Sequence, residues 1–177
     1  KLFLFWIFSI YCLKSATIDE SKVFTRLNSS EYAEIRKSSN LNYLVFFYDP
    51  GCRYCQRGKQ NIAEIFPLLS LILPDLQLFK VNILDEVAAA DSESVTHVPL
   101  IILRKSGFNE SIQVPLYEKN QIVNTILRSY FGPVYEISQK IIGQKLLDLG
   151  ESSFVFIGSI DDPNYEEFEN ISNNLFL

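Results

Sequence analysis

Two cysteines stand three positions apart in the segment Cys52-Arg53-Tyr54-Cys55, after an apolar run and at the start of a helical pattern. At a helix start, this spacing places one sulfur at the exposed tip and the other one turn deeper. The free N–H groups of a helix N-terminus carry a partial positive charge, which favours a thiolate. Because thiolates attack disulfides, the pair predicts thiol–disulfide exchange, with Cys52 as the nucleophile and Cys55 as the resolving cysteine.

The two residues between the cysteines are expected to modulate this site. Arg53 adds a cation that stabilises the thiolate and so destabilises a disulfide of the pair, which favours an oxidant. Tyr54 offers a ring and a hydroxyl without charge. Three other interpretations stay open: a static structural bridge, two incidental cysteines, or half of a zinc site. Zinc usually takes four ligands and only His97 remains as a further Cys or His ligand, so we expect no metal and no cofactor.

A buried strand and a helix flank the cysteine pair. Residues 43–48, YLVFFY, form a continuous apolar run that is typical of a strand buried on both faces, and Asp49-Pro50-Gly51 ends it. The residues after Cys52 predict a helix, which Pro67 kinks or ends, because apolar side chains follow helical spacing at Ile62, Ile65 and Phe66. A Cys-x-x-Cys motif between a strand and a helix favours a redox role.

The remaining elements predict an α/β sheet with helices on both faces. Asn28 and Glu31 form a capping box that starts a helix through about residue 37. Further strands are expected at residues 23–27, 76–83, 99–104 and 111–116, with Ser106-Gly107 as the turn of a hairpin. Further helices are expected at residues 85–90 and 120–130, the second packing through Ile122, Val123, Ile126 and Leu127.

The composition excludes some classes of function. The 177 residues contain 16 Lys and Arg against 21 Asp and Glu, a net charge of −5, whereas a nucleic-acid groove needs clustered positive charge. A hydrophobic fraction of 47% is enough for a packed core, and three cysteines are too few for a disulfide-stapled miniprotein. We therefore expect a folded protein that does not bind nucleic acid.

Residues 1–17 have the features of a secretory signal peptide. A basic first residue precedes an apolar run over residues 2–13, and small residues follow at 15–17. The run is shorter than the ~20 residues of a membrane span, so we expect none here; a buried helix or an uncleaved anchor is the alternative. Cleavage removes Cys12 and leaves one cysteine pair. Asn-x-Ser sequons agree with an oxidising compartment and make three residues glycosylation candidates, Asn28, Asn109 and Asn170.

The chain divides after the predicted helix at residues 120–130. Gly132-Pro133 breaks the pattern, and the same series of elements then begins again. The expected elements are strands at residues 134–137 and 154–157 and helices at residues 139–147 and 166–171. We therefore expect a redox domain over residues 18–131, followed over residues 132–177 by the start of a second, cysteine-free unit that is truncated. The alternative is that these last elements dock on the first domain.

Residues 43–56, YLVFFYDPGCRYCQ, resemble the active-site segment of the thioredoxin superfamily. The segment is most similar to the a-type domain of protein disulfide isomerases, whose pattern is a strand followed by F-Y-A-P-W-C-x-x-C-K. Lys80-Val81-Asn82 and Asp85 resemble the K-V-D segment of that family, and the likeness extends over about residues 23–130. Residues 134–171 resemble the opening of a b-type domain. The resemblance implies a thioredoxin fold, a central mixed sheet flanked by helices.

Val98-Pro99 falls where that family keeps a cis-proline facing the dithiol. The resemblance therefore implies a cis peptide that turns the backbone of Val98 toward Cys52, where a substrate strand can pair. It also implies that Cys52 and Cys55 alternate between a dithiol and a disulfide. His97, two residues before Pro99, either modulates the site or is a loop histidine with an ordinary hydrogen bond.

Phe46 departs from the family pattern, which usually has a buried acidic residue at this position to relay the proton of the deeper cysteine. Side chains of a strand alternate between its faces, so Phe46 shares a face with Leu44 and Tyr48. By the resemblance, this position points under the dithiol. We therefore expect slow deprotonation of Cys55 and slow release of a mixed disulfide. Gly51 and Asp49 also replace the Trp and the Ala of the family pattern.

The resemblance implies a thiol–disulfide oxidoreductase with protein disulfide isomerase-like activity, acting in protein folding and redox homeostasis. Its expected partners are unfolded or disulfide-containing secretory proteins, in the lumen of the endoplasmic reticulum or elsewhere in the secretory pathway. The alternative is a redox-slow thioredoxin-fold chaperone or binding module, which Phe46 favours. The pair of Cys52 and Cys55 together with Pro99 favours the enzyme.

Overall fold

The computed structural model describes residues 23–108, 111–114, 118–132, 140–149 and 161–175. The expected order of elements in the first unit is confirmed. These elements are, in chain order, β1 (Thr25–Arg26), α2 (Ser29–Lys37), β2 (Asn42–Tyr48), α3 (Arg53–Ile72), β3 (Leu76–Asn82), α4 (Val87–Ser92), β4 (Leu100–Arg104), β5 (Ser111–Val114) and α5 (Lys119–Phe131).

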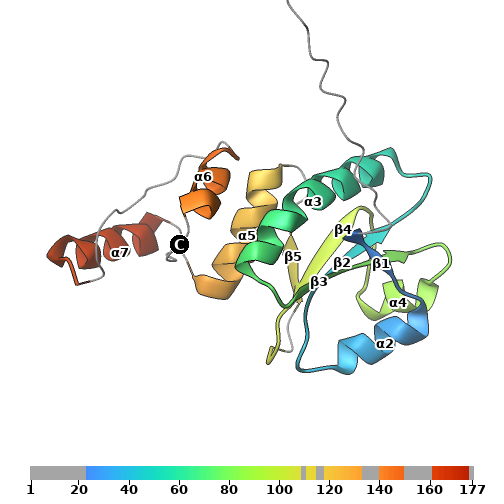
Figure 1. Ribbon diagram of the computed structural model, residues 1–177. Helices are drawn as coiled ribbons and strands as arrows, with labels where there is room; N and C mark the ends of the chain where they lie inside the picture. The colour runs from blue at the N-terminus through green and yellow to red at the C-terminus, as the bar shows by residue number, and fades with distance from the viewer. Residues whose placement is uncertain (1–22, 109–110, 115–117, 133–139, 150–160, 176–177) are drawn as a thin grey trace, which may run out of the picture.

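The five strands form one mixed sheet in the order β1-β3-β2-β4-β5 (Figure 1). β3 runs parallel to both β1 and β2, whereas β4 runs antiparallel to both β2 and β5. β2 therefore lies at the centre of the sheet. Its residues from Tyr43 to Phe47 are all buried, as its continuous apolar run predicts.

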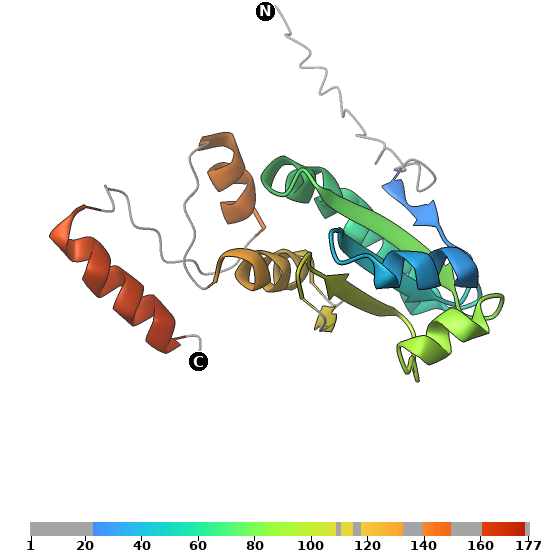
Figure 2. The ribbon, with the colours of Figure 1, turned by 90° about the horizontal axis from the view of Figure 1, so that it is seen from below.

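Helices cover the two faces of the sheet, as predicted (Figure 2). On the face that carries α3 and α5, which we call the dithiol face, Leu44 and Phe46 pack with Cys55 and with the predicted stripe of α5. On the opposite face, which we call the second face, Tyr43, Val45 and Phe47 pack with residues of α2 and α4. Alternation along β2 thus places Phe46 on the same face as the dithiol.

Some predicted boundaries differ from the structure. The first strand is limited to Thr25–Arg26 and the short third helix spans Val87–Ser92. Pro67 is predicted to kink or to end its helix, and the second alternative is wrong, because α3 continues to Ile72. Pro67 lies on the exposed side of α3, while Ile65, Leu68 and Leu69 are buried around it. Packing of these apolar side chains therefore stabilises the helix beyond the proline, which leaves only one hydrogen bond unmade.

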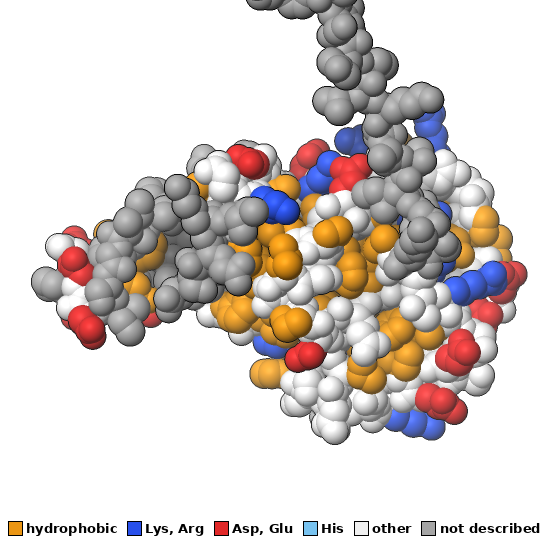
Figure 3. All heavy atoms as spheres, in the orientation of Figure 1, with side chains coloured by type: hydrophobic (Ala, Val, Ile, Leu, Met, Phe, Trp, Pro, Cys, Tyr) orange, Lys and Arg blue, Asp and Glu red, His pale blue; other side chains and the backbone are white. Residues whose placement is uncertain are grey.

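Two helices follow the first unit, α6 (Lys140–Leu147) and α7 (Pro163–Leu175). Both fall where helices are expected, and Ile142 of α6 is buried. The strands expected at residues 134–137 and 154–157 lie outside the described residues, so the second unit stays a prediction. In the space-filling view of Figure 3, apolar side chains reach the surface over α3 and α5. No helix in the described ranges is long and apolar enough to cross a membrane.

Candidate functional site

Cys52 is the N-cap residue of α3, and its extended backbone precedes the first helical residue, Arg53. The Sγ atom of Cys52 accepts a hydrogen bond from the backbone N–H of Cys55 at 3.1 Å. The carbonyl oxygen of Cys52 accepts from the N–H of Gln56 at 3.3 Å, which begins the helix. The sulfur therefore takes the place of the side-chain oxygen that usually caps a helix, and it faces the positive end of the helix dipole.

The loop between β2 and α3 holds Cys52 through Asp49. The backbone N–H of Cys52 donates to the carbonyl oxygen of Asp49 at 3.1 Å, and the N–H of Gly51 donates to Oδ1 of Asp49 at 2.7 Å. Asp49 follows β2 directly, so the central strand fixes the start of α3 over a very short connection. The residue sequence Asp-Pro-Gly is typical of a turn, but it does not predict the two hydrogen bonds that Asp49 accepts.

The two cysteines differ sharply in exposure. Cys52 is partly exposed, whereas Cys55 is fully buried, and both are free thiols in this structure. Burial is the largest cause that raises the pKa of Cys55 to about 11, with a further contribution from its hydrogen bond to Cys52. A backbone hydrogen bond from Asp49 acts in the opposite direction. The deeper thiol is thus protonated at neutral pH, and the disulfide between the pair stays a prediction.

Phe46 occupies the floor of the site, as the alternation of β2 predicts. It is fully buried in the same cluster as Cys55 and packs against Phe24, with ring centroids 6.1 Å apart. It also stacks on Tyr48, whose ring lies 5.4 Å from Nζ of Lys59. The position therefore supplies apolar packing and no group that can accept a proton. The charge of Asp49 is near enough to raise the pKa of Cys55.

The peptide between Val98 and Pro99 is cis, as predicted. Val98 packs against the cluster that contains Cys55 and also against the cluster of the second face. Both residues are partly buried and directly precede β4, which pairs with β2. The segment thus lies at the end of the central strands, against the same core as the dithiol.

The residues between the cysteines are exposed. Arg53 begins α3, and the side chain of Tyr54 is 78% exposed, so the structure presents both to solvent beside Cys52. Their effect on the redox poise stays a prediction. His97 is exposed, and its Nδ1 atom lies 3.2 Å from Oγ1 of Thr96, which is an ordinary local hydrogen bond.

The other predicted sites are spread over the surface. Asn28 and Asn170 are exposed, while Asn109 lies outside the described residues, and glycosylation stays a prediction for all three. Asn28 also completes the predicted capping box, since its Oδ1 accepts from the N–H of Glu31 at 2.9 Å. Across the described part of the chain, no three His, Cys, Asp or Glu side chains group together as a metal site would require.

Comparison with known proteins agrees with this geometry. Residues 23–128 match the thioredoxin family. Mitochondrial thioredoxin 3 from Saccharomyces cerevisiae in its oxidised form is 21% identical, with a TM-score of 0.50 over 61% of this chain and 97% of that chain. Oxidised thioredoxin O2 from Arabidopsis thaliana is 21% identical, with a TM-score of 0.51 over 61% of this chain and 95% of that one. None of the curated proteins compared with this sequence matches it. The structural likeness establishes the thioredoxin fold.

Proposed function

Because this chain belongs to the thioredoxin family, we propose that it is a thiol–disulfide oxidoreductase whose reacting groups are Cys52 and Cys55. The observation that carries this proposal is the placement of the partly exposed residue Cys52 at the N-terminus of α3, one turn before the fully buried Cys55. The helix N-terminus stabilises the attacking thiolate, and burial protects the second thiol from solvent until a substrate is bound.

Reduction of a substrate proceeds by two exchanges. The thiolate of Cys52 attacks one sulfur of a substrate disulfide, so that a mixed disulfide forms and the other substrate sulfur leaves as a thiolate and takes a proton. Cys55 then loses its proton and attacks the sulfur of Cys52. A disulfide forms between Cys52 and Cys55, the second substrate sulfur leaves, and two electrons have passed to the substrate. The reverse sequence oxidises a substrate dithiol.

The substrates proposed here are unfolded or disulfide-containing proteins of the secretory pathway, and the activity is protein disulfide isomerase-like. The apolar run and small residues at positions 1–17 support this, together with the sequons at Asn28, Asn109 and Asn170. In an oxidising compartment the pair meets substrates whose disulfides form and rearrange. Rescue of scrambled ribonuclease without added thiol tests isomerisation, and processing of residues 1–17 in secretory cells tests the compartment.

Insulin reduction tests the redox proposal. The wild-type protein with dithiothreitol as electron donor should reduce insulin, Cys52→Ala should be inactive, and Cys55→Ala should accumulate a mixed disulfide that mass spectrometry locates at Cys52. Full activity of Cys52→Ala, or capture of substrate at Cys55, would contradict the assignment of the nucleophile.

A binding module is the second candidate, and Phe46 is the observation that favours it. With a buried phenyl ring in place of a proton acceptor, a thiol of pKa about 11 resolves mixed disulfides slowly. Such a protein would bind unfolded chains but would exchange their disulfides only slowly. Suppression of aggregation that is equal in the wild type and in Cys52→Ala, combined with negligible insulin reduction in both, identifies this case.

A further inference from the structure

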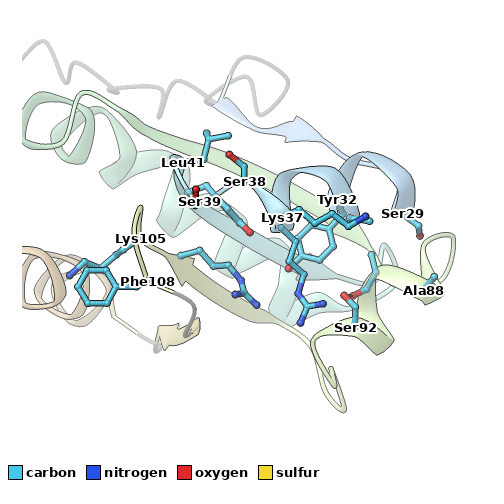
Figure 4. A pocket seen from close by; sticks show the side chains of 15 residues that line it. Ser29, Tyr32, Lys37, Ser38, Ser39, Leu41, Ala88, Ser92, Lys105 and Phe108 are labelled. Atoms are coloured by element: carbon cyan, nitrogen blue, oxygen red, sulfur yellow. Dashed lines mark hydrogen bonds between the residues drawn. The ribbon is translucent and has the colours of Figure 1, made fainter.

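A hollow of about 400 Å³ opens beside α2 and α4 (Figure 4). Two of its lining residues, Tyr43 and Ala89, belong to the core cluster of the second face, so the hollow lies on the side of the sheet opposite the dithiol. This volume is within the range that small-molecule sites occupy. Its walls come from α2 and the loop after it, from α4, from β2 and β4, and from the segment that follows β4, and they include Arg36, Lys37, Leu41, Tyr43, Ala89 and Arg104. No local sequence pattern marks this hollow, because its walls come from segments far apart in the chain.

The hollow is positive although the protein as a whole is negative. Two residues that line the hollow, Arg36 and Arg104, share the carboxylate of Glu93, whose side chain is 4% exposed: Nε of Arg36 lies at 2.8 Å and Nη2 of Arg104 at 2.7 Å. The Oη atom of Tyr32 donates to the same carboxylate at 2.7 Å. One carboxylate thus faces two guanidinium groups. Lys37 adds a further cation to the wall, and the side chains that line the hollow include no acidic one.

A buried hydroxyl group also faces the hollow. Tyr43 is 1% exposed, it lines the hollow, and it stands directly opposite Arg104 in the register of β2 and β4. Its Oη atom has no hydrogen-bond partner among the described residues. Burial raises the pKa of Tyr43, so the hydroxyl keeps its proton at neutral pH and offers it as a donor. A buried donor without an acceptor is unfavourable, and a ligand oxygen would satisfy it.

We propose that this hollow binds a small organic anion, a carboxylate or phosphate group on an apolar body. The acidic group would lie against Arg36 and Lys37 and accept a hydrogen bond from Tyr43. A guanidinium group suits this role because it can donate two parallel hydrogen bonds to the oxygens of one carboxylate or phosphate group. The apolar body would pack on Leu41 and on the alanines of α4. The site is separate from the dithiol, and the proposal does not rest on the redox function.

Titration followed by ¹H–¹⁵N NMR of the full chain tests the proposal. Phenyl phosphate and benzoate should cause saturable shifts of the amides of residues 36–43 and 88–92, and leave the amides of Cys52 and Cys55 unchanged. Inorganic phosphate should shift the same amides with weaker affinity, because it lacks the apolar body. Benzyl alcohol should shift none of them at the same concentrations. Equal binding of benzyl alcohol, or no saturable shift with either aromatic anion, would overturn the proposal.

Matched variants locate the contacts. Tyr43→Phe removes only the hydroxyl and should weaken phenyl phosphate binding roughly 5-fold, whereas Tyr130→Phe removes another buried hydroxyl outside the hollow and should change nothing. Arg36→Gln should weaken binding roughly tenfold, while Lys145→Gln, which removes an exposed charge on α6, should leave it intact. Loss of affinity in the two control variants, or unchanged affinity in both Tyr43→Phe and Arg36→Gln, would contradict the assigned contacts.

Discussion

The two faces of the sheet differ in the partners that they provide for buried ionisable groups. On the dithiol face, Cys55 lies fully buried beside the phenyl ring of Phe46, and the ion pair between Lys119 and Glu64 stays near the surface, with 42% and 30% of its side chains exposed. On the second face, the charged side chain of Glu93 is only 4% exposed and has three partners, which are Arg36, Arg104 and Tyr32.

This difference shows what burial does to a group with and without partners. Two guanidinium groups and a hydroxyl bind the carboxylate of Glu93 and so replace the water that burial removes from it. Cys55 stays neutral because burial penalises its thiolate, which raises its pKa. The second face therefore contains a buried ion-pair network as a permanent part of the fold. The dithiol face instead keeps Cys55 as a neutral thiol, and its thiolate is needed only during disulfide exchange.

Phe46→Glu should give the largest effect, since it gives the dithiol face a buried acid. A carboxylate under the dithiol can accept the proton of Cys55, and a positioned proton acceptor is typically worth ~10²–10⁴-fold in rate. The free energy of unfolding should fall by about 3–5 kcal/mol, because a large apolar side chain is lost. Stopped-flow measurement of mixed-disulfide release, with urea unfolding, checks both.

Phe46→Leu is the matched control for that variant, since it keeps the site apolar and should leave the release rate unchanged. If Phe46→Glu and the wild type release at equal rates, another group already carries the proton. Asp49 would then be the first candidate, because its charge lies close enough to affect Cys55.

Glu93→Ala should destabilise the protein by about 3–5 kcal/mol, because it leaves the guanidinium of Arg104 buried without its carboxylate. Glu64→Ala on the dithiol face removes a more exposed ion-pair partner and should cost only about 0–1 kcal/mol. Urea unfolding of both variants measures the contrast. Similar losses of unfolding free energy for the two variants would contradict the difference between the buried and the more exposed ion pair.

Alkaline pH should destabilise the wild type more than Cys55→Ala. The folded-state pKa of Cys55 is raised to about 11, so the unfolded chain loses this proton first as the pH rises. The stability that the protonated Cys55 contributes is fully present below about pH 9 and is lost between pH 9 and 11. The free energy of unfolding should fall by on the order of 2–3 kcal/mol over this range. The buried tyrosines titrate in both proteins, so the difference between their unfolding free energies at pH 8 and pH 11 isolates Cys55. An equal decline in the two would argue against the raised pKa.

The two helix caps should give the smallest effects on stability. Asn28→Ala removes the oxygen that caps α2 and should cost about 1 kcal/mol. Cys52→Ala removes the sulfur that caps α3. Because sulfur is a weak acceptor, the free energy of unfolding should fall by only roughly 0.3 kcal/mol. Urea unfolding measures both changes. A larger loss for Cys52→Ala than for Asn28→Ala would mean that the sulfur is mainly a structural cap.

Features that depend on neighbours in the chain could be read from the sequence. The capping box at Asn28, the apolar strand through Phe46 and the buried stripe of α5 all appear where the pattern places them. The cysteine pair at a helix start is of the same kind, because its depth difference follows from one turn of helix. The side of β2 on which Phe46 lies also follows from strand alternation.

The tertiary structure alone decided features that join distant segments. Pro67 does not end α3, because packing of the buried residues around it outweighs the missing hydrogen bond. Glu93 meets Tyr32 from 61 positions away, and Arg104 from 11 positions away. The hydrophobic pattern of the sequence does not predict these partners of Glu93, because helical and strand periodicity determine only the face of its element on which a side chain lies. The register of β2 against β4 and the packing of α2 on α4 then determine what that side chain meets.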